Sequence, residues 1–331
     1  MSVPVVAFLN SKGGVGKTSL VYHTAWMLAD LGYRVVAADL DPQANLSLVC
    51  LGDERLSAIM NDGQSTTVYQ ALRPLQQGTG DVETPALETL GEGLALLCGD
   101  IGMYGFESAL TDAWTSCHDG DRRALRVIGS ISNLLRRAAE IHRADAVIAD
   151  LGPSLGAINR AAIIATDSIV IPLQADILSV RGLRDLGTRL NIWRAEWAVR
   201  QKSFVADDIE RPSGQMNSIG YVVTQIRQYS GRLHKSVHQW LDQIPHEFRT
   251  RILGRLSEAC GNVDNDEFCL GIIRQYHSLM GMALEAHKPV FHLKPADGAL
   301  GAHVAAGRDA YQAFQSLSLN IASKSGFAKL T

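Results

Sequence analysis

The stretch Ser11-Lys12-Gly13-Gly14-Val15-Gly16-Lys17-Thr18-Ser19 joins an apolar run at residues 3–9 to a second run at residues 20–31. The first run predicts a buried strand and the second a helix. A strand, a glycine-rich turn, a Lys-Thr pair and a helix, in this order, are typical of a phosphate-binding loop. The glycines let several backbone N–H groups point at one anion, and the start of the helix adds positive potential. We therefore expect nucleotide phosphates to bind at this turn.

Two side chains of the loop have expected roles in such a site. Lys17 would place a point charge on the β- and γ-phosphates, and the Thr18 hydroxyl would be a ligand for Mg²⁺. The stretch departs from the pattern GxxxxGK(S/T) at its first glycine, and it contains a further lysine, Lys12.

Acidic residues follow two later apolar runs that predict strands. Asp39 and Asp41 close the first of these strands, and Asp150 closes the second, with Gly152 shortly after it. Because the carboxyl ends of parallel strands meet at one edge of a sheet, we expect these acids beside the glycine loop. A small, flexible residue such as Gly152 suits a loop that senses the γ-phosphate. The pattern therefore predicts a Mg²⁺-nucleotide site.

Apolar runs that predict strands alternate with runs that predict helices. The expected strands are 3–9, 34–39, 94–98, 146–150, 168–173, 219–224 and 288–293, and the expected helices are 20–31, 67–72, 121–142, 155–165, 180–199 and 233–240. Near-continuous Val, Ile, Ala and Leu strands favour an α/β fold: a mostly parallel, doubly wound sheet with helices on both faces. We expect a single P-loop nucleotide-binding domain over residues 1–331, with insertions at about 52–93 and 201–217 and a helical segment at 103–143.

The composition excludes several classes of protein. The chain of 331 residues is 46% apolar and 20% charged, with a net charge of −3, which argues against a strongly basic nucleic-acid-binding protein. Residues 200–331 hold 15 Lys and Arg against 12 Asp and Glu, so the basic surface that exists is expected there. No apolar run approaches the roughly 20 residues of a membrane span, and the five cysteines form no CxxC motif. We expect a cytoplasmic protein with reduced cysteines and no membrane association.

Three motifs resemble those of the ParA/MinD/Soj family of ATPases. Lys12 to Ser19 resembles the deviant Walker A motif of that family, and Asp39-Leu40-Asp41-Pro42-Gln43-Ala44-Asn45 is similar to its switch I. Asp150-Leu151-Gly152-Pro153-Ser154-Leu155-Gly156 resembles its Walker B and switch II, with Leu-Gly where Cys-Pro is common. The similarity continues through Ser168 to Gln174, resumes at Leu284 to Val290, and is greatest for the ParA-type partition ATPases.

The resemblance implies a role for each matched position. In the family, the lysine at the position of Lys12 reaches across an ATP-sandwich dimer to the partner's nucleotide, as an arginine finger does in trans. Lys17 contacts the phosphates and Asp41 positions the attacking water, so the implied catalytic residues are Lys12, Lys17 and Asp41. Mg²⁺ would be held by Thr18, Asp39 and Asp150. The implied nucleotide-binding residues are Lys12, Gly13, Gly14, Val15, Gly16, Lys17, Thr18, Ser19, Thr224, Gln225, Pro295 and Asp297, the last four at the adenine.

The same resemblance implies a switch that dimerises on binding ATP, hydrolyses ATP slowly to ADP and phosphate, and binds DNA without sequence preference. Such a switch segregates plasmid or chromosomal DNA on the nucleoid, and a ParB-like or other partner protein stimulates its hydrolysis. DNA of this kind is held by Lys and Arg on phosphates. The candidates here are Arg227, Arg232, Lys235, Arg249, Arg251, Arg255 and Arg274.

Three alternatives remain from the sequence. A ParA-like ATPase that positions a protein cargo would use the same residues. A MinD-type membrane switch would need a C-terminal amphipathic helix rich in Lys, whereas residues 316–331 contain only Lys324 and Lys329. An amidoligase of the same superfamily would share the glycine loop.

Overall fold

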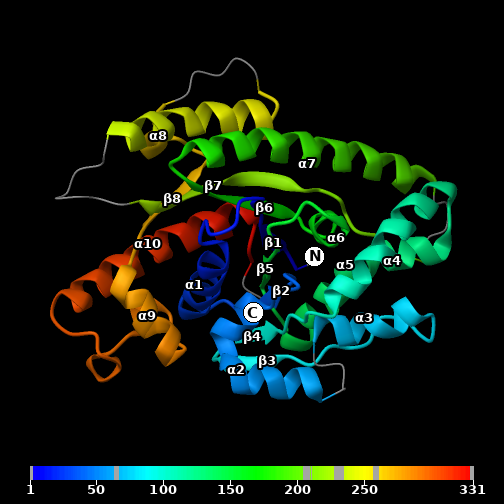
Figure 1. Cartoon of the computed structure of the whole chain (residues 1–331), viewed down its shortest axis with the longest axis horizontal. Helices are drawn as coiled ribbons and strands as arrows, with labels where there is room; N and C mark the ends of the chain where they lie inside the picture. The colour runs from blue at the N-terminus through cyan, green and yellow to red at the C-terminus, as the bar shows by residue number, and fades with distance from the viewer. Residues whose placement is uncertain are drawn as a thin grey trace.

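The sheet is the centre of the molecule. The computed structural model describes residues 3–62, 67–203, 209, 211–226, 235–255 and 261–328. Within these residues, eight strands form one sheet in the order β3-β4-β2-β5-β1-β6-β7-β8 (Figure 1). Neighbouring strands pair in parallel except for β3 and β4, which are antiparallel. The strands are β1 (Val5–Phe8), β2 (Val35–Asp39), β3 (Glu88–Gly91), β4 (Leu94–Leu97), β5 (Ala146–Asp150), β6 (Ser168–Gln174), β7 (Asn217–Ile226) and β8 (Cys269–Arg274).

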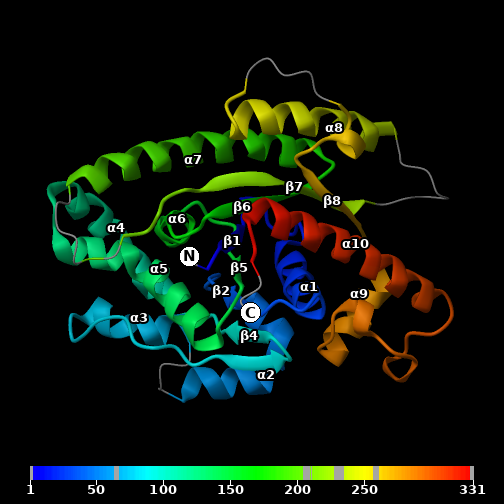
Figure 2. The ribbon, with the colours of Figure 1, turned by 180° about the vertical axis from the view of Figure 1, so that it is seen from behind.

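Helices cover both faces of the sheet, as the two opposite views show (Figures 1 and 2). The α-helices are α1 (Lys17–Asp30), α2 (Asn45–Asn61), α3 (Val68–Gln77), α4 (Met103–Ser116), α5 (Arg122–His142), α6 (Ala157–Ile164), α7 (Ile177–Ser203), α8 (Lys235–Glu247), α9 (His277–Ala286) and α10 (Ala302–Ser325). The short helices are η1 (Cys117–Asp119), η2 (Phe248–Ile252), η3 (Val263–Asn265), η4 (Val290–His292) and η5 (Pro295–Asp297). This arrangement confirms the predicted α/β fold with a mostly parallel sheet.

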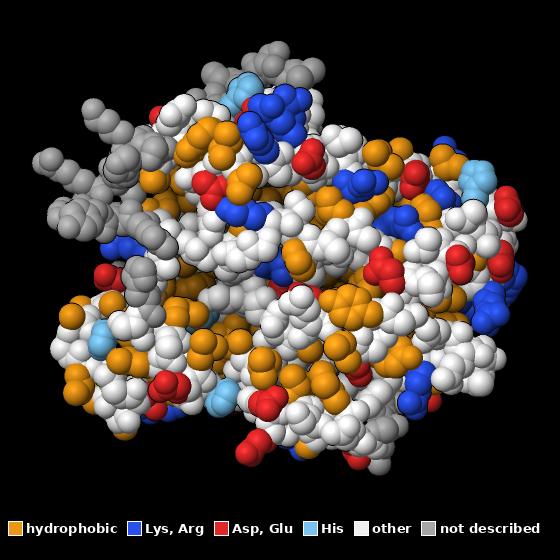
Figure 3. Space-filling model, in the orientation of Figure 1, with side chains coloured by type: hydrophobic (Ala, Val, Ile, Leu, Met, Phe, Trp, Pro, Cys, Tyr) orange, Lys and Arg blue, Asp and Glu red, His pale blue; other side chains and the backbone are white. Residues whose placement is uncertain are grey.

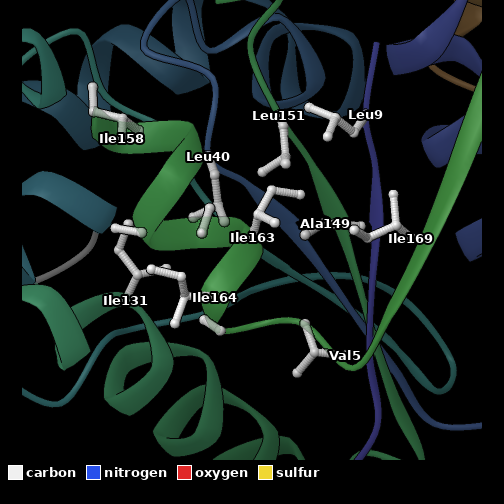
Figure 4. Packing of buried hydrophobic residues seen from close by; sticks show 14 of the residues in the cluster. Val5, Leu9, Leu40, Ile131, Ala149, Leu151, Ile158, Ile163, Ile164 and Ile169 are labelled. Atoms are coloured by element: carbon white, nitrogen blue, oxygen red, sulfur yellow. The ribbon is translucent and has the colours of Figure 1, made fainter. Parts of the chain in front are cut away.

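Side chains of β1 show why the sheet is buried on both faces. Val5 and Ala7, with Leu9 directly after the strand, point into one apolar cluster, and Val6 and Phe8 point into the other. This alternation is the two-residue period of a strand whose two faces are both covered. In the first cluster, isoleucines of α5 and α6 pack against residues of β1, β5 and β6 and of the loops after the strands (Figure 4). The second cluster is closed by α1 and α10.

The prediction of a strand at residues 288–293 is wrong. This segment contains the short helix η4, after Pro289. Phe291 packs its ring edge-on against His23 of α1, at a centroid distance of 5.8 Å. The apolar residues of the segment are therefore explained by packing against α1 and α10 rather than by a place in the sheet.

Strand β8 at the sheet edge was not predicted. Only Leu270 and Ile273 of its residues are buried, so it lacks the continuous apolar run of the inner strands. A Cβ on Gly271, in its middle, would make ordinary van der Waals contact with Leu317 of α10, at 3.5 Å. The expected insertion at 52–93 also begins inside a helix, since α2 continues through Gly52 with a kink at φ 77°.

Candidate nucleotide site

The glycine loop leaves the central strand β1 and enters α1 at Lys17. Gly14 and Gly16 have φ of 74° and 82°, a left-handed conformation that favours glycine. Gly16 is the N-cap of α1, and no described side chain caps this helix end. The first backbone N–H groups of α1 are therefore left for an anion in the loop, as the sequence predicts.

Lys17 and Asp150 form a buried ion pair behind the loop. The Lys17 Nζ lies 2.9 Å from Asp150 Oδ1, and Thr18 Oγ1 donates a hydrogen bond of 2.6 Å to Asp150 Oδ2. Burial raises the pKa of Asp150, and the Lys17 charge and the Thr18 hydrogen bond oppose this shift. The structure thus brings together the predicted phosphate lysine and two of the three predicted metal ligands.

Asp39, the third predicted metal ligand, is fully buried at the start of switch I. Its Oδ2 accepts hydrogen bonds of 2.8 Å from both the backbone N–H and the hydroxyl of Ser47. Burial and the charge of Asp150 raise the pKa of Asp39 to about 7, although the Ser47 hydrogen bonds act in the opposite direction. Asp39 therefore fixes the start of α2 through Ser47, and Ser47 Oγ in turn accepts from the Gly99 N–H at 2.8 Å.

Asp41 lies at the wall of the cavity, next to switch II. Its Oδ1 accepts a 3.0 Å hydrogen bond from the Gln43 N–H. Gly152 is so close that a Cβ on it would lie 3.2 Å from Asp41 Oδ1. Asn159 of α6 donates 2.7 Å to the Gly152 carbonyl and so fixes this part of switch II. The predicted water-positioning acid and the predicted γ-phosphate sensor are thus in contact.

Lys12 points along the outer side of the loop. Its Nζ lies 2.5 Å from Asp176 Oδ2 and 2.6 Å from Gln174 Oε1. Sequence reasoning missed both acceptors, although Gln174 directly follows the strand predicted at 168–173 and Asp176 comes two residues later. An acid directly after a strand that borders the glycine loop is the signal that was available.

Thr224 and Gln225 reach the loop from the end of β7. The Thr224 hydroxyl donates 2.7 Å to the Val15 carbonyl, and Gln225 Nε2 donates 2.9 Å to the Gly14 carbonyl. Gln225 itself has a left-handed backbone, with φ of 54°. Both predicted residues therefore contact the loop, and their direct partners are its carbonyl groups.

Two cavities open on either side of the first turns of α1. The first, of about 390 Å³, is lined by the whole loop from Lys12 to Ser19, by Asp41 and Pro153 of the switches, and by α9. The second, of about 310 Å³, lies at the ends of β7 and β8. Gly16, Ser19, His23 and Met280 line both, so the two cavities share the surface of α1.

Pro295 and Asp297 do not line either cavity. They form η5, where Asp297 Oδ1 pairs with Lys288 Nζ at 2.7 Å and Oδ2 accepts from the Lys294 N–H. Hydrogen bonds from Lys288 and Lys294 lower the pKa of Asp297. The segment around η5 is therefore stabilised by the ion pair between Asp297 and Lys288. A contact between this segment and a nucleotide base stays a prediction.

The predicted DNA contacts are spread unevenly over the structure. Arg227, Arg232 and the side chain of Lys235 lie outside the described residues. Arg274 is exposed at the end of β8, and Arg251 is 45% exposed beside Glu247. On the face shown in Figure 3, Lys and Arg are interspersed with acids, and a compact basic group lies over α8.

The inclusion of Arg249 among these candidates is wrong. Its side chain is buried and Nη2 lies 2.6 Å from Asp266 Oδ1. The pair packs under the ring of Phe268, so the Arg249 charge is used inside the protein.

The described part of the chain has no preformed metal cluster and no membrane-spanning helix. No group of three or more His, Cys, Asp or Glu among the described residues is arranged to hold a metal ion. A Mg²⁺ ion usually takes one or two carboxylates and completes its shell with phosphates and water, so Asp150 beside Thr18 fits it without such a cluster. None of the helices in the described ranges has the length and apolar character to cross a bilayer.

A glycine loop on a central parallel strand, with a buried Lys-Asp pair and acids at neighbouring strand ends, defines a P-loop nucleotide-binding protein. A family model described as an AAA domain matches residues 3–201. The chain belongs to this family, and the curated proteins that it is similar to include ParA-type partition proteins.

Two curated relatives illustrate this membership. The chromosome partitioning protein ParA of Caulobacter vibrioides is 33% identical over 186 residues, which are 55% of this chain and 60% of that protein. The sporulation initiation inhibitor protein Soj of Bacillus subtilis is 31% identical over 184 residues, covering 55% of this chain and 62% of Soj. The chain spans about half the length of the curated relatives it matches.

Solved structures share the fold over nearly the whole chain. The DIP2308 protein of Corynebacterium diphtheriae superposes with a TM-score of 0.73 at 21% identity, covering 97% of this chain and 98% of that one. A variant of Cyanothece McdA in complex with ATP has a TM-score of 0.64 at 13% identity, covering 100% and 99%. At these identities the likeness concerns the fold.

Proposed function

We propose that this chain is an ATP-dependent dimerising switch of the ParA type, which hydrolyses ATP and binds DNA without sequence preference to segregate DNA. The observation that carries the proposal is the gathering of Lys12, Lys17, Thr18, Asp41 and Asp150 around one loop and cavity. The McdA relative bound to ATP and the ParA relative from Caulobacter support the same assignment.

The phosphates would lie in the first cavity. The loop N–H groups and the start of α1 would bind the anion, and Lys17 would exchange Asp150 for the β- and γ-phosphates. Thr18 Oγ1 and Asp150 Oδ2 would hold Mg²⁺, Asp150 through water, with Asp39 behind them in the metal shell. Mg²⁺, when bound, neutralises charge on the phosphate oxygens during transfer.

Asp41 would position the attacking water. It is the predicted catalytic acid that lines the first cavity, and Gly152 and the Gln43 N–H fix its carboxylate. Replacing Asp41 with Ala should leave binding intact and trap the ATP-bound state, because the remaining residues bind the nucleotide without activating water.

The base would lie in the second cavity. Tyr276 and Phe314 give it apolar aromatic walls, and the amides of Gln225 and Gln275 offer both donors and acceptors. The described lining residues include no carboxylate to accept from the N–H edge of guanine, and the neutral amides can serve both the acceptor and the donor of adenine, so the lining favours adenine. This cavity thus supports Thr224 and Gln225 as part of the adenine site.

Lys12 would act in trans, and the dimer would create the DNA-binding surface. A partner protein, ParB-like or of another kind, would stimulate hydrolysis and release the DNA. A protein cargo in place of DNA would use the same nucleotide site, and DNA retention distinguishes the two.

The test measures nucleotide binding, dimerisation and DNA retention together, each with and without ATP and Mg²⁺. Lys17→Ala should abolish nucleotide binding. Lys12→Ala should keep binding and lose ATP-dependent dimerisation, whereas Lys202→Ala, a matched control at the exposed end of α7, should change neither. Full dimerisation of Lys12→Ala with ATP would refute the role in trans, and ATP-independent DNA retention would refute the switch.

A further inference from the structure

The contacts of Lys12 within its own subunit have a consequence for the dimer. Its ammonium makes two short contacts, to Asp176 Oδ2 at 2.5 Å and to Gln174 Oε1 at 2.6 Å. Lys12 and Asp176 are 21% and 37% exposed, so the pair lies at the rim of the site and not in the core. A lysine that is held this way does not extend away from its own subunit.

Asp176 is held in place independently of Lys12. Its Oδ1 accepts a 2.8 Å hydrogen bond from the Ser179 N–H, and its carbonyl accepts from Val180 at 3.2 Å, so it caps the start of α7. The second oxygen, Oδ2, is therefore fixed toward the loop. The lysine is the movable member of the pair, since its four-carbon stem is flexible.

Gln174 is also fixed. Its Nε2 donates to the Gly14 carbonyl at 3.1 Å and to Gln225 Oε1 at 2.7 Å, and its backbone N–H donates to Ser179 Oγ at 3.1 Å. The amide oxygen is thereby presented to Lys12. The cradle for the ammonium is thus built from the loop, β6, β7 and the start of α7.

The electrostatics of Asp176 agree with a carboxylate that stays charged. Partial burial acts to raise its pKa, but hydrogen bonds from Lys12 and from the Ser179 backbone outweigh burial and lower the pKa. Asp176 therefore offers the Lys12 ammonium a full negative charge at neutral pH.

We propose that Asp176 is a positioning residue that holds Lys12 in cis in the single subunit, and that the two-subunit site closes only when each lysine exchanges Asp176 for the phosphates of the partner's nucleotide. The proposal rests on the proposed function, since it assumes a Lys12 that acts in trans. The Lys12–Asp176 ion pair then weakens dimerisation, because one such pair must break in each of the two subunits before the dimer can close.

The decisive variant is Asp176→Asn. Asparagine keeps an oxygen for the Ser179 N–H, so the cap of α7 is retained, while the charge that faces Lys12 is lost. Exposed ion pairs are worth up to about 1 kcal/mol, or about fivefold in an equilibrium constant. With two pairs released, the dimer dissociation constant at saturating imido analogue of ATP should fall by about four- to twenty-fivefold.

The control is Asp185→Asn, which removes the same charge from an exposed position on the same helix. It should leave the dissociation constant unchanged, and both variants should melt at the wild-type temperature. A second measurement without nucleotide follows acylation of Lys12 by an amine-reactive ester with peptide mass spectrometry. Acylation should be faster in Asp176→Asn and unchanged in Asp185→Asn.

The outcomes separate the two proposals. If wild-type protein does not dimerise with the analogue, the switch itself is refuted. If wild type dimerises and Asp176→Asn dimerises equally or more weakly, the role of Asp176 as a hold on Lys12 is refuted. Unchanged acylation of Lys12 in Asp176→Asn would also overturn it, whatever the dimer does.

Discussion

Asp39 is a residue whose burial makes the stability of the protein depend on pH. Its pKa in the folded protein is about 7, against 3.8 as the ordinary value, so folding favours the protonated form. The contribution of the protonated Asp39 to the free energy of unfolding is fully present below about pH 4 and is lost as the pH rises through 7. We predict that Asp39→Asn, which keeps an acceptor for Ser47, gains stability relative to wild type between pH 5 and pH 8.

Urea unfolding of the wild-type protein and of Asp39→Asn, without nucleotide and Mg²⁺, measures this difference in stability at each pH. The difference in unfolding free energy should widen with pH and level off above pH 7. A constant difference across that range would show that Asp39 does not take up a proton on folding. Asp242→Asn on the exposed part of α8 serves as a charge control.

Gly152 controls the space beside the water-positioning acid. A Cβ at this position would lie 3.2 Å from Asp41 Oδ1, so the carboxylate must shift by a few tenths of an ångström. We predict that Gly152→Ala lowers the ATP hydrolysis rate about tenfold while ATP binding is kept, because small displacements of catalytic groups are costly. Gly105→Ala, where the nearest atom is 3.9 Å away, should hydrolyse ATP like wild type.

At the scale of elements, His23 joins three segments that are distant in sequence. Its Nδ1 donates to the Ser19 carbonyl at 2.7 Å, its Nε2 accepts from the Val290 N–H at 3.1 Å, and its ring stacks on Phe314 at 4.8 Å. Burial lowers the pKa of His23 to about 4, despite the hydrogen bond to Ser19. α1 is thus tied to η4 and α10 by a neutral imidazole.

We predict that His23→Leu destabilises the protein by about 2–3 kcal/mol at pH 7.5, through the lost hydrogen bonds. The loss of stability that His23→Leu causes should become smaller as the pH falls toward 4.5. A folded pKa below the ordinary 6.5 means that wild type loses stability as the pH falls through this range, whereas the variant lacks the group. Thermal melting at both pH values measures this, and a cost that grows on acidification would contradict it.

The elements also show what the sequence can predict. The inner strands β1, β2, β5 and β6 are buried on both faces, so each is a continuous apolar run, and their positions were predicted closely. β8 lies at the edge and residues 288–293 pack on helices, so in both places burial is decided by distant parts of the chain.

The site also contains some residues that local sequence motifs predict and others that only the folded structure brings together. Lys17, Thr18 and Asp150 belong to local motifs of fixed spacing, and the structure brings them together. Asp176 does not, because it is 164 residues from its partner Lys12. Ser47 is only eight residues from Asp39, but it lies outside the motif that the sequence matches. The sequence therefore offers Asp176 as an acid shortly after a strand, and only the structure pairs it with Lys12.

The whole molecule has too little net positive charge for one subunit to hold DNA strongly. With a net charge of −3, DNA binding must come from a local basic surface that dimerisation doubles. Among the described residues the exposed candidates are Arg251, Arg255 and Arg274, of which Arg255 lies over the ring of Phe268. Four phosphate contacts per dimer, two from each subunit, give a fall in affinity of about a hundredfold between 50 and 200 mM salt.

We predict that the double variant Arg251→Ala, Arg274→Ala weakens ATP-dependent DNA retention on all sequences alike and flattens its dependence on salt. Phosphate contacts contribute equally to every sequence, and each contact that is lost lowers the salt slope by about one. Arg126→Ala, exposed on α5, removes the same charge from another surface and should leave the slope unchanged. An unchanged slope in the double variant, with dimerisation intact, would place the DNA surface elsewhere on the dimer.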